Sequence, residues 1–429
     1  MRSTPEQHHP RGDRAELLIA LGLAAGPVVA LGFTRFAYAL LLPAMRHELS
    51  WNFAAAGGMN TANALGYIAG CLSATWWVRR FGSRAVFNAT IAVGALMLLL
   101  SATTGNYVVL ATLRTIGGLA TAITFVIGSA LATRVHAGGN SGRSALLVAV
   151  YMTGVGIGIA ASGIVVPIAL ELGDSGGWKL GWLVMGILSV IALVPAMYAV
   201  RRVPEQTAPP AGSGRLGLTA LVPTFVWYLL FGAGYVAYMT FIVALLASQG
   251  LSNGSEAVFF VILGIASAVG TLVWAPVVGR LPHGWGPALA SVVVLIGVLP
   301  VLLWPGLAGA IVSAIIFGSS FMAGPTAATV IARRSLPAHG WTLGIALLTT
   351  SFSAGQAIGP LAAGLLSDTA GGIVLGLWLS VALLAVAALV ALRQHDRLVI
   401  TAAAPAIGDQ PPAREPAPRS MHEEPRSTA

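Results

Sequence analysis

Two arginines inside apolar runs are the residues whose type and position best suit ligand binding. Arg35 stands in the middle of the apolar run over 17–45, and Arg114 lies in the run over 107–133. A charged side chain at the centre of a membrane-spanning helix costs about 2.5–3.5 kcal/mol on insertion scales, so it normally faces a protein interior or a wet cavity. A guanidinium presents five donors in a fixed fork that suits a carboxylate or a phosphate.

No carboxylate is predicted close to either arginine. Two guanidinium groups that face one cavity would therefore make the cavity electropositive, and an anionic substrate would supply the missing charge. We expect Arg35 to anchor such a substrate, with Arg114 in support. The alternative is that both arginines bind carbonyl groups at helix ends and only lock the fold.

Four tyrosines and a glutamine are the other predicted substrate-binding residues. The stretch from Gly32 to Tyr38 recurs two hundred residues later, from Gly232 to Tyr238, with a tyrosine in place of the arginine. A tyrosine can line a cavity and either stack on a substrate or hydrogen-bond to it. The predicted set is Tyr38, Tyr151, Tyr235, Tyr238 and Gln356. The alternative for each tyrosine is an ordinary place in the helical core.

Polar residues at helical spacing form two stripes, each on one face of a predicted helix. Three- and four-residue steps return to the same side of a helix, so such residues share one face. One stripe is Asn60, Asn63 and Tyr67, and the other is Thr349, Ser353 and Gln356. The alternative is ordinary hydrogen bonding between helices, worth about 0.6 kcal/mol per contact.

Twelve apolar runs must position these residues, and they place the chain in a membrane. Of the 429 residues, 56% are hydrophobic and 9% are charged, and the mean hydropathy is +0.84. Soluble domains carry about 25% charged residues, whereas about 20 apolar residues cross a bilayer as a helix. The runs cover 17–45, 53–78, 85–104, 107–133, 144–170, 179–200, 217–248, 256–280, 287–304, 307–332, 342–366 and 372–393. We predict an all-α integral membrane protein with twelve transmembrane helices.

A polar linker divides the runs into two sets of six. The linker is rich in proline and glycine, and the two ends of the chain are polar and without an apolar face. We predict a disordered lead over 1–14, a six-helix bundle over 15–200, a flexible linker over 201–215, a second six-helix bundle over 216–393 and a disordered tail over 394–429.

The distribution of lysine and arginine predicts the orientation. Of the 23 such residues, nineteen lie in the two termini and in the loops on the same side, whereas Arg46 and Lys179 lie on the opposite side. Cytoplasmic loops carry an excess of these residues, so both termini are predicted to be cytoplasmic. Topology therefore explains the net charge of +9, and no basic cluster outside the membrane is large enough for nucleic acid.

Glycines repeat between the fifth and the eleventh run at an offset of 201 residues. The corresponding positions are Gly154 and Gly355, Gly158 and Gly359, and Gly163 and Gly364. Two halves with the same orientation typically enclose a substrate site near the midplane. Small residues let helices approach closely, so we predict gating roles for Gly154, Gly158, Gly163, Gly355 and Gly359. Dense packing alone is the alternative.

The arrangement resembles the major facilitator superfamily over residues 15–395. Within it, the chain is similar to the bacterial YbfB/YjiJ-type group in the stretches Gly32–Tyr38, Asn60–Tyr67, Gly154–Gly158, Tyr238–Ile242 and Gly355–Pro360. The resemblance implies two parallel six-helix repeats, with the second and eleventh helices packed across the interface so that the two polar stripes meet near the outer gate. It also implies a role in proton-linked or conformational coupling for Arg114, which Gly118 follows four residues later.

The loop after the second run resembles the cytoplasmic gate motif of this superfamily. The resemblance implies gating roles for Arg79, Arg80, Gly82 and Arg84. The superfamily motif has an aspartate at the position of Arg79, so this loop lacks the carboxylate of the usual charge relay.

We predict a secondary active transporter of a small organic anion, and not an enzyme. Cys71 is the single cysteine and no histidine lies in a predicted span, so neither a metal nor a cofactor is expected. The alternative is proton-driven efflux of lipophilic or cationic compounds, against which the lack of a carboxylate inside the spans counts. A membrane sensor or an intramembrane enzyme is a remote alternative. The predicted partners are the substrate, the bilayer and protons, with the protein acting as a monomer in the bacterial inner membrane.

Overall fold

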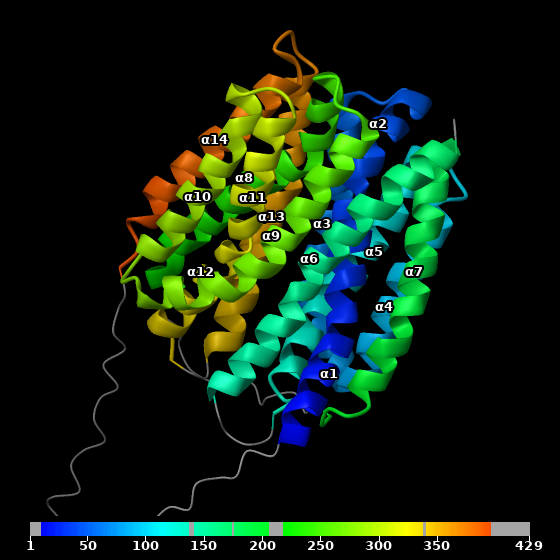
Figure 1. Cartoon of the computed structure of the whole chain (residues 1–429). Helices are drawn as coiled ribbons and strands as arrows, with labels where there is room; N and C mark the ends of the chain where they lie inside the picture. Colours follow the sequence, from blue (N-terminus) through cyan, green and yellow to red (C-terminus); the bar gives the residue numbers. More distant parts are fainter. Residues whose placement is uncertain (1–9, 137–140, 174–175, 206–217, 338–339, 396–429) are drawn as a thin grey trace, which may run out of the picture.

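The described part of the chain is helical. In the computed structural model, residues 10–136, 141–173, 176–205, 218–337 and 340–395 are described, and these residues contain no strand (Figure 1). Before residue 201 the helices are α1 (Pro10–Pro27), η1 (Val28–Phe36), α2 (Ala37–Leu49), α3 (Phe53–Phe81), α4 (Ser83–Ser101), α5 (Tyr107–Ala132), α6 (Ser141–Leu172) and α7 (Gly177–Val200). After residue 217 they are η3 (Leu218–Leu221), α8 (Val222–Ser248), α9 (Asn253–Arg280), α10 (Trp285–Leu303), α11 (Leu307–Ser320), α12 (Ala323–Ser335), α13 (Trp341–Ser367) and α14 (Gly372–Ala391).

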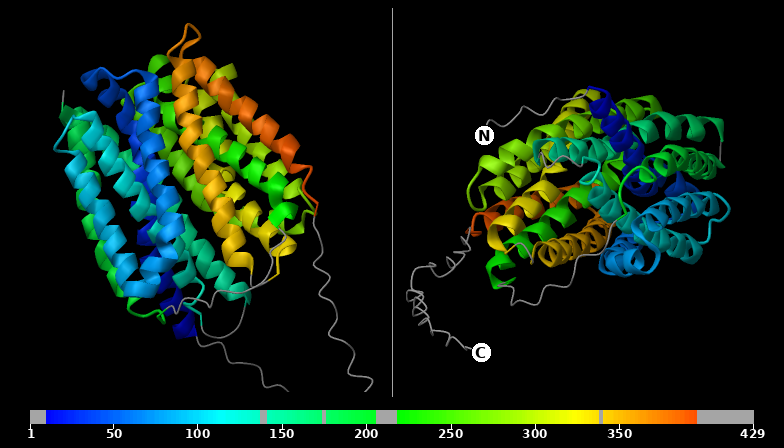
Figure 2. Two further views of the ribbon diagram at one scale, coloured as in Figure 1. Left: turned by 180° about the vertical axis from the view of Figure 1, so that it is seen from behind. Right: turned by 90° about the horizontal axis from the view of Figure 1, so that it is seen from below.

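The helices form two groups that lie side by side. Figures 1 and 2 show the N-terminal group, α1 to α7, next to the C-terminal group, α8 to α14. The main contacts between the groups join α3 to α13, α6 to α9 and α2 to α8. The predicted twelve spans are recovered, because α1, η1 and α2 form one continuous element and α11 and α12 together form another.

The glycine repeat holds equivalent helix pairs together within each group. A Cβ atom at Gly158 of α6 would lie 2.7 Å from the carbonyl oxygen of Val28, and one at Gly359 of α13 would lie 2.2 Å from that of Ala233. Likewise, a Cβ atom at Gly154 would lie 2.3 Å from the carbonyl oxygen of Ala24, and one at Gly355 would lie 1.9 Å from that of Leu229. Because α6 packs on the first span of its group as α13 packs on α8, the sequence repeat is also a repeat of packing.

The same repeat brings the two groups together. A Cβ atom at Gly163 of α6 would lie 2.6 Å from the Cβ of Phe260 in α9, and one at Gly364 of α13 would lie 2.4 Å from the carbonyl oxygen of Phe53 in α3. Helices without side chains at the contact approach closely, which is how membrane helices associate.

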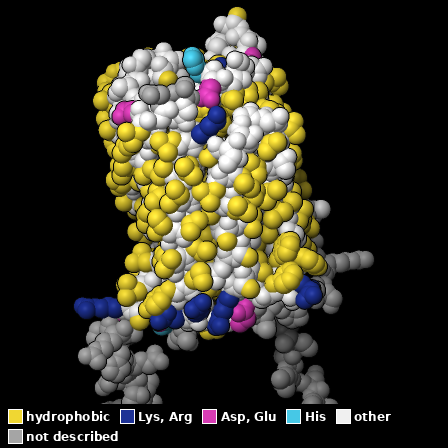
Figure 3. All heavy atoms as spheres, turned by 90° about the vertical axis from the view of Figure 1, so that its right-hand side faces the viewer, with side chains coloured by type: hydrophobic (Ala, Val, Ile, Leu, Met, Phe, Trp, Pro, Cys, Tyr) yellow, Lys and Arg dark blue, Asp and Glu magenta, His cyan; other side chains and the backbone are white. Residues whose placement is uncertain are grey.

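The exterior matches a membrane environment. Ten helical segments of the described chain are long and apolar enough to cross a membrane, and α3 and α13 are the long helices that fall short. These two helices face each other and carry the predicted polar stripes, so they need less apolar surface. Figure 3 shows an apolar belt with lysine and arginine gathered at one end. We call this the arginine-rich end; it contains the loop from α3 to α4.

Two predicted boundaries are corrected. Helix α1 begins at Pro10, earlier than the predicted start at residue 15. Its first turns are held by Arg143 of α6, which donates to the backbone oxygen of Asp13 at 2.8 Å and pairs with Glu16 at 3.1 Å. The predicted disordered tail begins too early, because Gln394 is buried and its Oε1 accepts a hydrogen bond from Thr224 at 2.6 Å. Residues 1–9, 206–217 and 396–429 lie outside the described chain.

Candidate functional site

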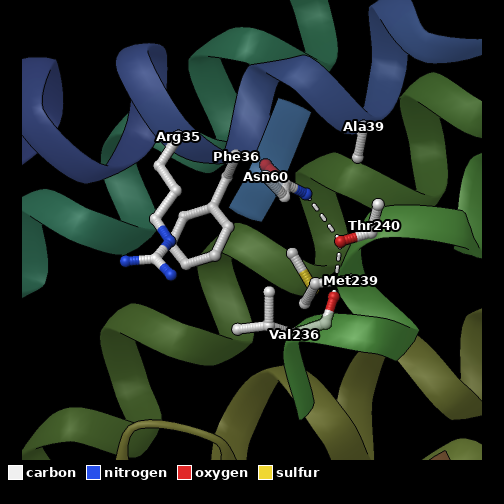
Figure 4. Close-up of a pocket in the computed structure, with 7 residues that line it drawn as sticks. All are labelled: Arg35, Phe36, Ala39, Asn60, Val236, Met239 and Thr240. Atoms are coloured by element: carbon white, nitrogen blue, oxygen red, sulfur yellow. Dashed lines mark hydrogen bonds between the residues drawn. The ribbon is translucent and has the colours of Figure 1, made fainter. Parts of the chain in front are cut away.

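Two adjoining pockets lie between the two groups of helices. Both pockets are narrow in this conformation, with cavity volumes of about 30 Å³ for the central pocket and about 10 Å³ for the adjoining pocket. The central pocket is lined by Leu31, Arg35, Phe36, Tyr67, Phe125, Tyr235, Phe321, Met322, Pro325, Phe352 and Gln356. The adjoining pocket, drawn in Figure 4, is lined by Arg35, Phe36, Ala39, Asn60, Val236, Met239 and Thr240. Arg35 and Phe36 therefore belong to both.

Arg35 is buried between the two groups and has an unsatisfied guanidinium. The residue is 6% exposed, and its guanidinium forms no hydrogen bond or ion pair with any described residue. Its one ring contact is with Tyr67, whose centroid lies 5.3 Å from the guanidinium carbon. No acidic residue lines either pocket. A guanidinium whose free donors face a pocket is suited to bind an anion.

The backbone that carries Arg35 is π-helical. In η1 the Thr34 hydroxyl donates to the carbonyl oxygen of Val29, five residues earlier, at 2.9 Å. The turn also depends on Gly32, where a Cβ atom would lie 2.5 Å from the Cα of Gly158 in α6. Wide turns of this kind occur frequently at functional sites. The sequence did not predict this irregularity, because apolar periodicity does not distinguish α from π turns.

Aromatic rings form the wall opposite Arg35. Phe321 lies in the break between α11 and α12, with its ring centroid 5.9 Å from that of Tyr235. The ring of Phe352 lies 5.5 Å from Tyr235 on α8, and Gln356 donates a hydrogen bond to the Tyr235 hydroxyl. The central pocket thus combines one cation with an apolar aromatic wall, which suits a ligand with an anionic group and an apolar body.

Arg114 does not face the pocket with Arg35, contrary to the expectation of a cavity lined by both. Its guanidinium donates to the backbone oxygen of Thr34 at 2.6 Å and to Oδ1 of Asn60 at 2.7 Å. The guanidinium carbon lies 4.5 Å from the ring centroid of Tyr38 and 5.8 Å from that of Trp182. These partners come from neighbouring helices of the N-terminal group, so Arg114 acts within that group.

Three of the four predicted tyrosines also lie away from the described pockets. Tyr38 donates to the backbone oxygen of Ala56 at 2.8 Å, and Tyr151 donates to that of Phe125 at 3.2 Å. Tyr238 forms a hydrogen bond with Ser313 inside the C-terminal group. Of the predicted substrate-binding residues, Arg35, Tyr235 and Gln356 line the central pocket.

The two polar stripes meet only through Tyr67 and Gln356, which line the central pocket together. Asn63 turns into the N-terminal group and donates to the backbone oxygen of Arg114 at 3.1 Å. Thr349 and Ser353 donate to carbonyl oxygens of their own helix. The contacts between the groups are instead Asn60 to Thr240, at 2.6 Å, and Thr61 to the backbone oxygen of Ala357, at 2.6 Å. Tyr67 lines the central pocket.

The arginine-rich end contains a carboxylate that the sequence motif lacks. Arg79 and Arg80 are exposed, and Gly82 has a left-handed backbone with φ of 82°. Glu205, just after α7, accepts hydrogen bonds from the backbone nitrogen and hydroxyl of Ser83 and pairs with Arg84 at 3.4 Å. The predicted flexible linker is therefore anchored over its first five residues, and a carboxylate from a distant segment caps α4.

The carboxylate of Glu205 should make the stability of the protein depend on pH, and replacing it with glutamine should remove this contribution. Burial raises the pKa of the Glu205 carboxyl, but hydrogen bonds from Ser83 and Arg84 and the charge of Arg84 lower it overall. A carboxyl group whose pKa is lowered in the folded state stabilises the protein at pH values above its ordinary pKa. This contribution is lost as the pH falls through the lowered pKa. We expect Glu205→Gln to reduce the thermal midpoint at pH 7, with the difference from wild type disappearing in acid. Equal midpoints at pH 7 would contradict the prediction.

At the opposite end, a carboxylate joins the two groups. Asp368, at the end of α13, accepts hydrogen bonds from the backbone nitrogens of Phe53 at 2.8 Å and Ala54 at 2.9 Å. These nitrogens belong to the first turn of α3, where the unpaired N–H groups and the helix dipole favour an anion. Asp368 thus holds together the ends of α3 and α13 in this conformation.

Asp368→Asn is expected to separate the groups at this end. The asparagine amide has one acceptor oxygen and no charge. Losing a helix cap costs about 1 kcal/mol, which corresponds to about a fivefold decrease in the population whose two groups are joined at this end. Spin labels would be attached to cysteines that replace the exposed residues Thr103 and Asn253, in a Cys71→Ser background. Pulsed electron paramagnetic resonance would then report the distance between the two groups at this end. Glu48→Gln is the matched control, because Glu48 binds Trp178 and Lys179 within the N-terminal group. An unchanged distance distribution in Asp368→Asn would refute the prediction.

Sequence reasoning missed several residues of the site. Phe321 and Met322 lie at a helix break just before Gly324 and Pro325, a signal that the sequence analysis did not use, and Phe352 is visible only as the repeat partner of Tyr151. Thr240 lies within Tyr238–Ile242, one of the stretches that carry the family resemblance, but no role was predicted for it. The functional positions of Asp368 and Glu205 depend on segments more than a hundred residues away.

The fold is shared with membrane transporters of known structure. A bacterial homolog of the human lysosomal transporter Spinster, in its inward-facing and occupied conformation, superposes with a TM-score of 0.69 and 16% identity over 91% of this chain and 97% of that chain. A D-xylose-proton symporter superposes with a TM-score of 0.67 and 14% identity over 89% and 97% of the two chains. At such low identity these similarities establish the fold.

Sequence similarity defines the family. Residues 27–392 match the family described as uncharacterised MFS-type transporter YbfB, and the chain belongs to this family of major facilitator transporters. The predicted family is thereby confirmed. The chain is also 30% identical, over 415 residues, to a chloramphenicol resistance protein of Streptomyces lividans, covering 90% of this chain and 98% of the relative.

Proposed function

We propose that this protein is a secondary active transporter of a small organic anion, working by alternating access between its two helix groups. Arg35 binds the anionic group, and the aromatic wall around Tyr235 packs on the apolar body of the substrate. The protein catalyses no covalent reaction and needs no cofactor. It acts as a monomer in the inner membrane, with the arginine-rich end and both termini in the cytoplasm.

The observation that carries this proposal is the isolated charge of Arg35. The residue is 6% exposed and lacks a hydrogen-bond or ion-pair partner among the described residues. Leaving one member of a buried ion pair without its partner costs about 3–5 kcal/mol. A structural arginine avoids this cost by binding carbonyl and amide oxygens, as Arg114 does. An anionic substrate would supply the missing partner of Arg35 each time it binds.

A second candidate function is export of a neutral aromatic compound. It is favoured by the similarity to a chloramphenicol resistance protein and by the predominance of apolar and aromatic side chains in the central pocket. In this case Arg35 would donate hydrogen bonds to a neutral acceptor group. The two candidates therefore differ in whether the substrate must carry a negative charge.

Transport of matched acids and amides tests the proposal. Purified protein in liposomes would be offered small aromatic and aliphatic carboxylates, each paired with its neutral primary amide, together with chloramphenicol. We expect at least one carboxylate to be transported at least about ten times faster than its amide, as the loss of one charge-assisted hydrogen bond predicts. Equal rates for acids and amides, or transport of chloramphenicol alone, would overturn the anion assignment in favour of the second candidate.

A further inference from the structure

One buried hydrogen bond joins the N-terminal and C-terminal groups beside Arg35. The amide nitrogen of Asn60, on α3, donates to the hydroxyl of Thr240, on α8, at 2.6 Å (Figure 4). Asn60 is 9% exposed and Thr240 is 1% exposed. Both residues line the same pocket as Arg35. The bond therefore lies at the wall of the proposed binding site and must break whenever the two groups separate there.

The direction of this hydrogen bond is set by Arg114. A guanidinium can only donate, and Arg114 donates to Oδ1 of Asn60 at 2.7 Å. A flipped amide would place its nitrogen against the guanidinium, donor facing donor. The hydroxyl of Thr240 donates to the backbone oxygen of Val236 at 2.6 Å, so its lone pair is available to accept from Asn60. In this series of hydrogen bonds, each donor meets an acceptor only when the amide nitrogen of Asn60 points to Thr240.

Arg114 is itself held by contacts from the N-terminal group alone. It donates to the backbone oxygen of Thr34, and its guanidinium lies over the ring of Tyr38. The side-chain nitrogen of Asn63 binds the Arg114 backbone at 3.1 Å. Arg114 is 5% exposed and lines neither pocket. It is placed to orient Asn60 and not to touch a ligand.

We propose that Arg114 is a positioning residue that locks the Asn60 amide toward Thr240, and thereby favours the conformation in which the two groups are joined beside Arg35. The proposal rests on the transporter function argued above. Arg114 thereby acts on the equilibrium between conformations through the hydrogen bond from Asn60 to Thr240. A substrate acceptor atom that reaches Asn60 would compete with Thr240 for the same donor, which connects occupancy of the site to separation of the groups.

A double-mutant cycle tests this route. The variants are Arg114→Lys, Thr240→Val and the pair, in the Cys71→Ser background with spin labels at Thr103 and Asn253 and without added substrate. A lysine keeps the charge but lacks the fork that binds Thr34 and Asn60 together. We expect each single variant to increase the population with separated groups by about fivefold, as for loss of one buried hydrogen bond. The double variant should match Thr240→Val, because the second change has no bond left to act on.

Further variants keep the test decisive where Arg114→Lys folds poorly. Asn60→Leu is close to asparagine in shape but can neither donate to nor accept from Thr240, so it should also separate the groups. Thr240→Ser keeps the hydroxyl and should preserve the wild-type distance distribution. Additive effects of Arg114→Lys and Thr240→Val, or a wild-type distribution in Asn60→Leu, would overturn the proposal. Because the distances are measured without substrate, a failure of the anion assignment leaves this test intact.

Discussion

Arg35→Gln is expected to abolish transport of the organic anion, with a loss of at least about 100-fold. Glutamine cannot supply the charge or the paired donors of a guanidinium, and removing the partner of a buried charge costs about 3–5 kcal/mol. The affected quantity is substrate binding in the central pocket, so the loss should appear both in the dissociation constant measured by calorimetry and in the initial rate of uptake by liposomes.

A conservative variant of Arg35 distinguishes an effect on substrate binding from an effect on folding. Arg35→Lys keeps the charge but not the fork, and should lose about tenfold, equivalent to one hydrogen bond to a charged group. Arg202→Gln, an exposed arginine that stacks on Tyr198 at 3.5 Å, is the control and should transport as wild type. Unchanged anion binding in Arg35→Gln would sink the assignment of Arg35 as the anchor. An unfolded Arg35→Gln protein would instead support its alternative role in locking the fold.

Gly355→Ala should have the second largest effect, on stability and transport together. A Cβ atom at this position of α13 would lie 1.9 Å from the carbonyl oxygen of Leu229 and 2.9 Å from the backbone nitrogen of Ala233, both in α8. Backbone atoms cannot move aside as a flexible side chain can, so α13 and α8 must separate. Overpacking of this kind costs about 1–3 kcal/mol and sometimes more.

Separation of α13 from α8 would also disturb the central pocket. Gln356 is adjacent to Gly355 and donates to Tyr235 of α8, so their hydrogen bond should weaken as the helices move apart. We expect a lower thermal midpoint in detergent. Transport should fall at least about tenfold, because a free-energy penalty above about 1.4 kcal/mol corresponds to more than a factor of ten. Gly279→Ala is the matched control, because Gly279 is exposed on α9 and nothing lies within 4 Å of an added Cβ. Equal midpoints for the two variants would contradict the packing argument.

Hydropathy and glycine spacing were sufficient to predict the membrane fold. A helix that crosses a bilayer must satisfy its backbone internally and present an apolar exterior, so its sequence carries the signal locally. The repeat of Gly158 as Gly359 predicted gating roles, with dense packing as the alternative, and the structure shows that both glycines pack closely on the first span of their own group. The apolar pattern does not show the π turn at Arg35 or the break at Phe321, although Gly324 and Pro325 mark the break locally.

What the sequence by itself determined about this protein is its class: a membrane transporter of twelve helices in two repeated groups, with two arginines at membrane depth. Only the tertiary structure decided what those arginines do. Both terminal nitrogens of Arg114 find acceptors, on Thr34 and Asn60, whereas Arg35 finds none among the described residues and faces the pocket. The reason is physical: hydrophobic burial is encoded residue by residue along a helix, but whether a buried charge is paired depends on atoms that distant helices bring to it.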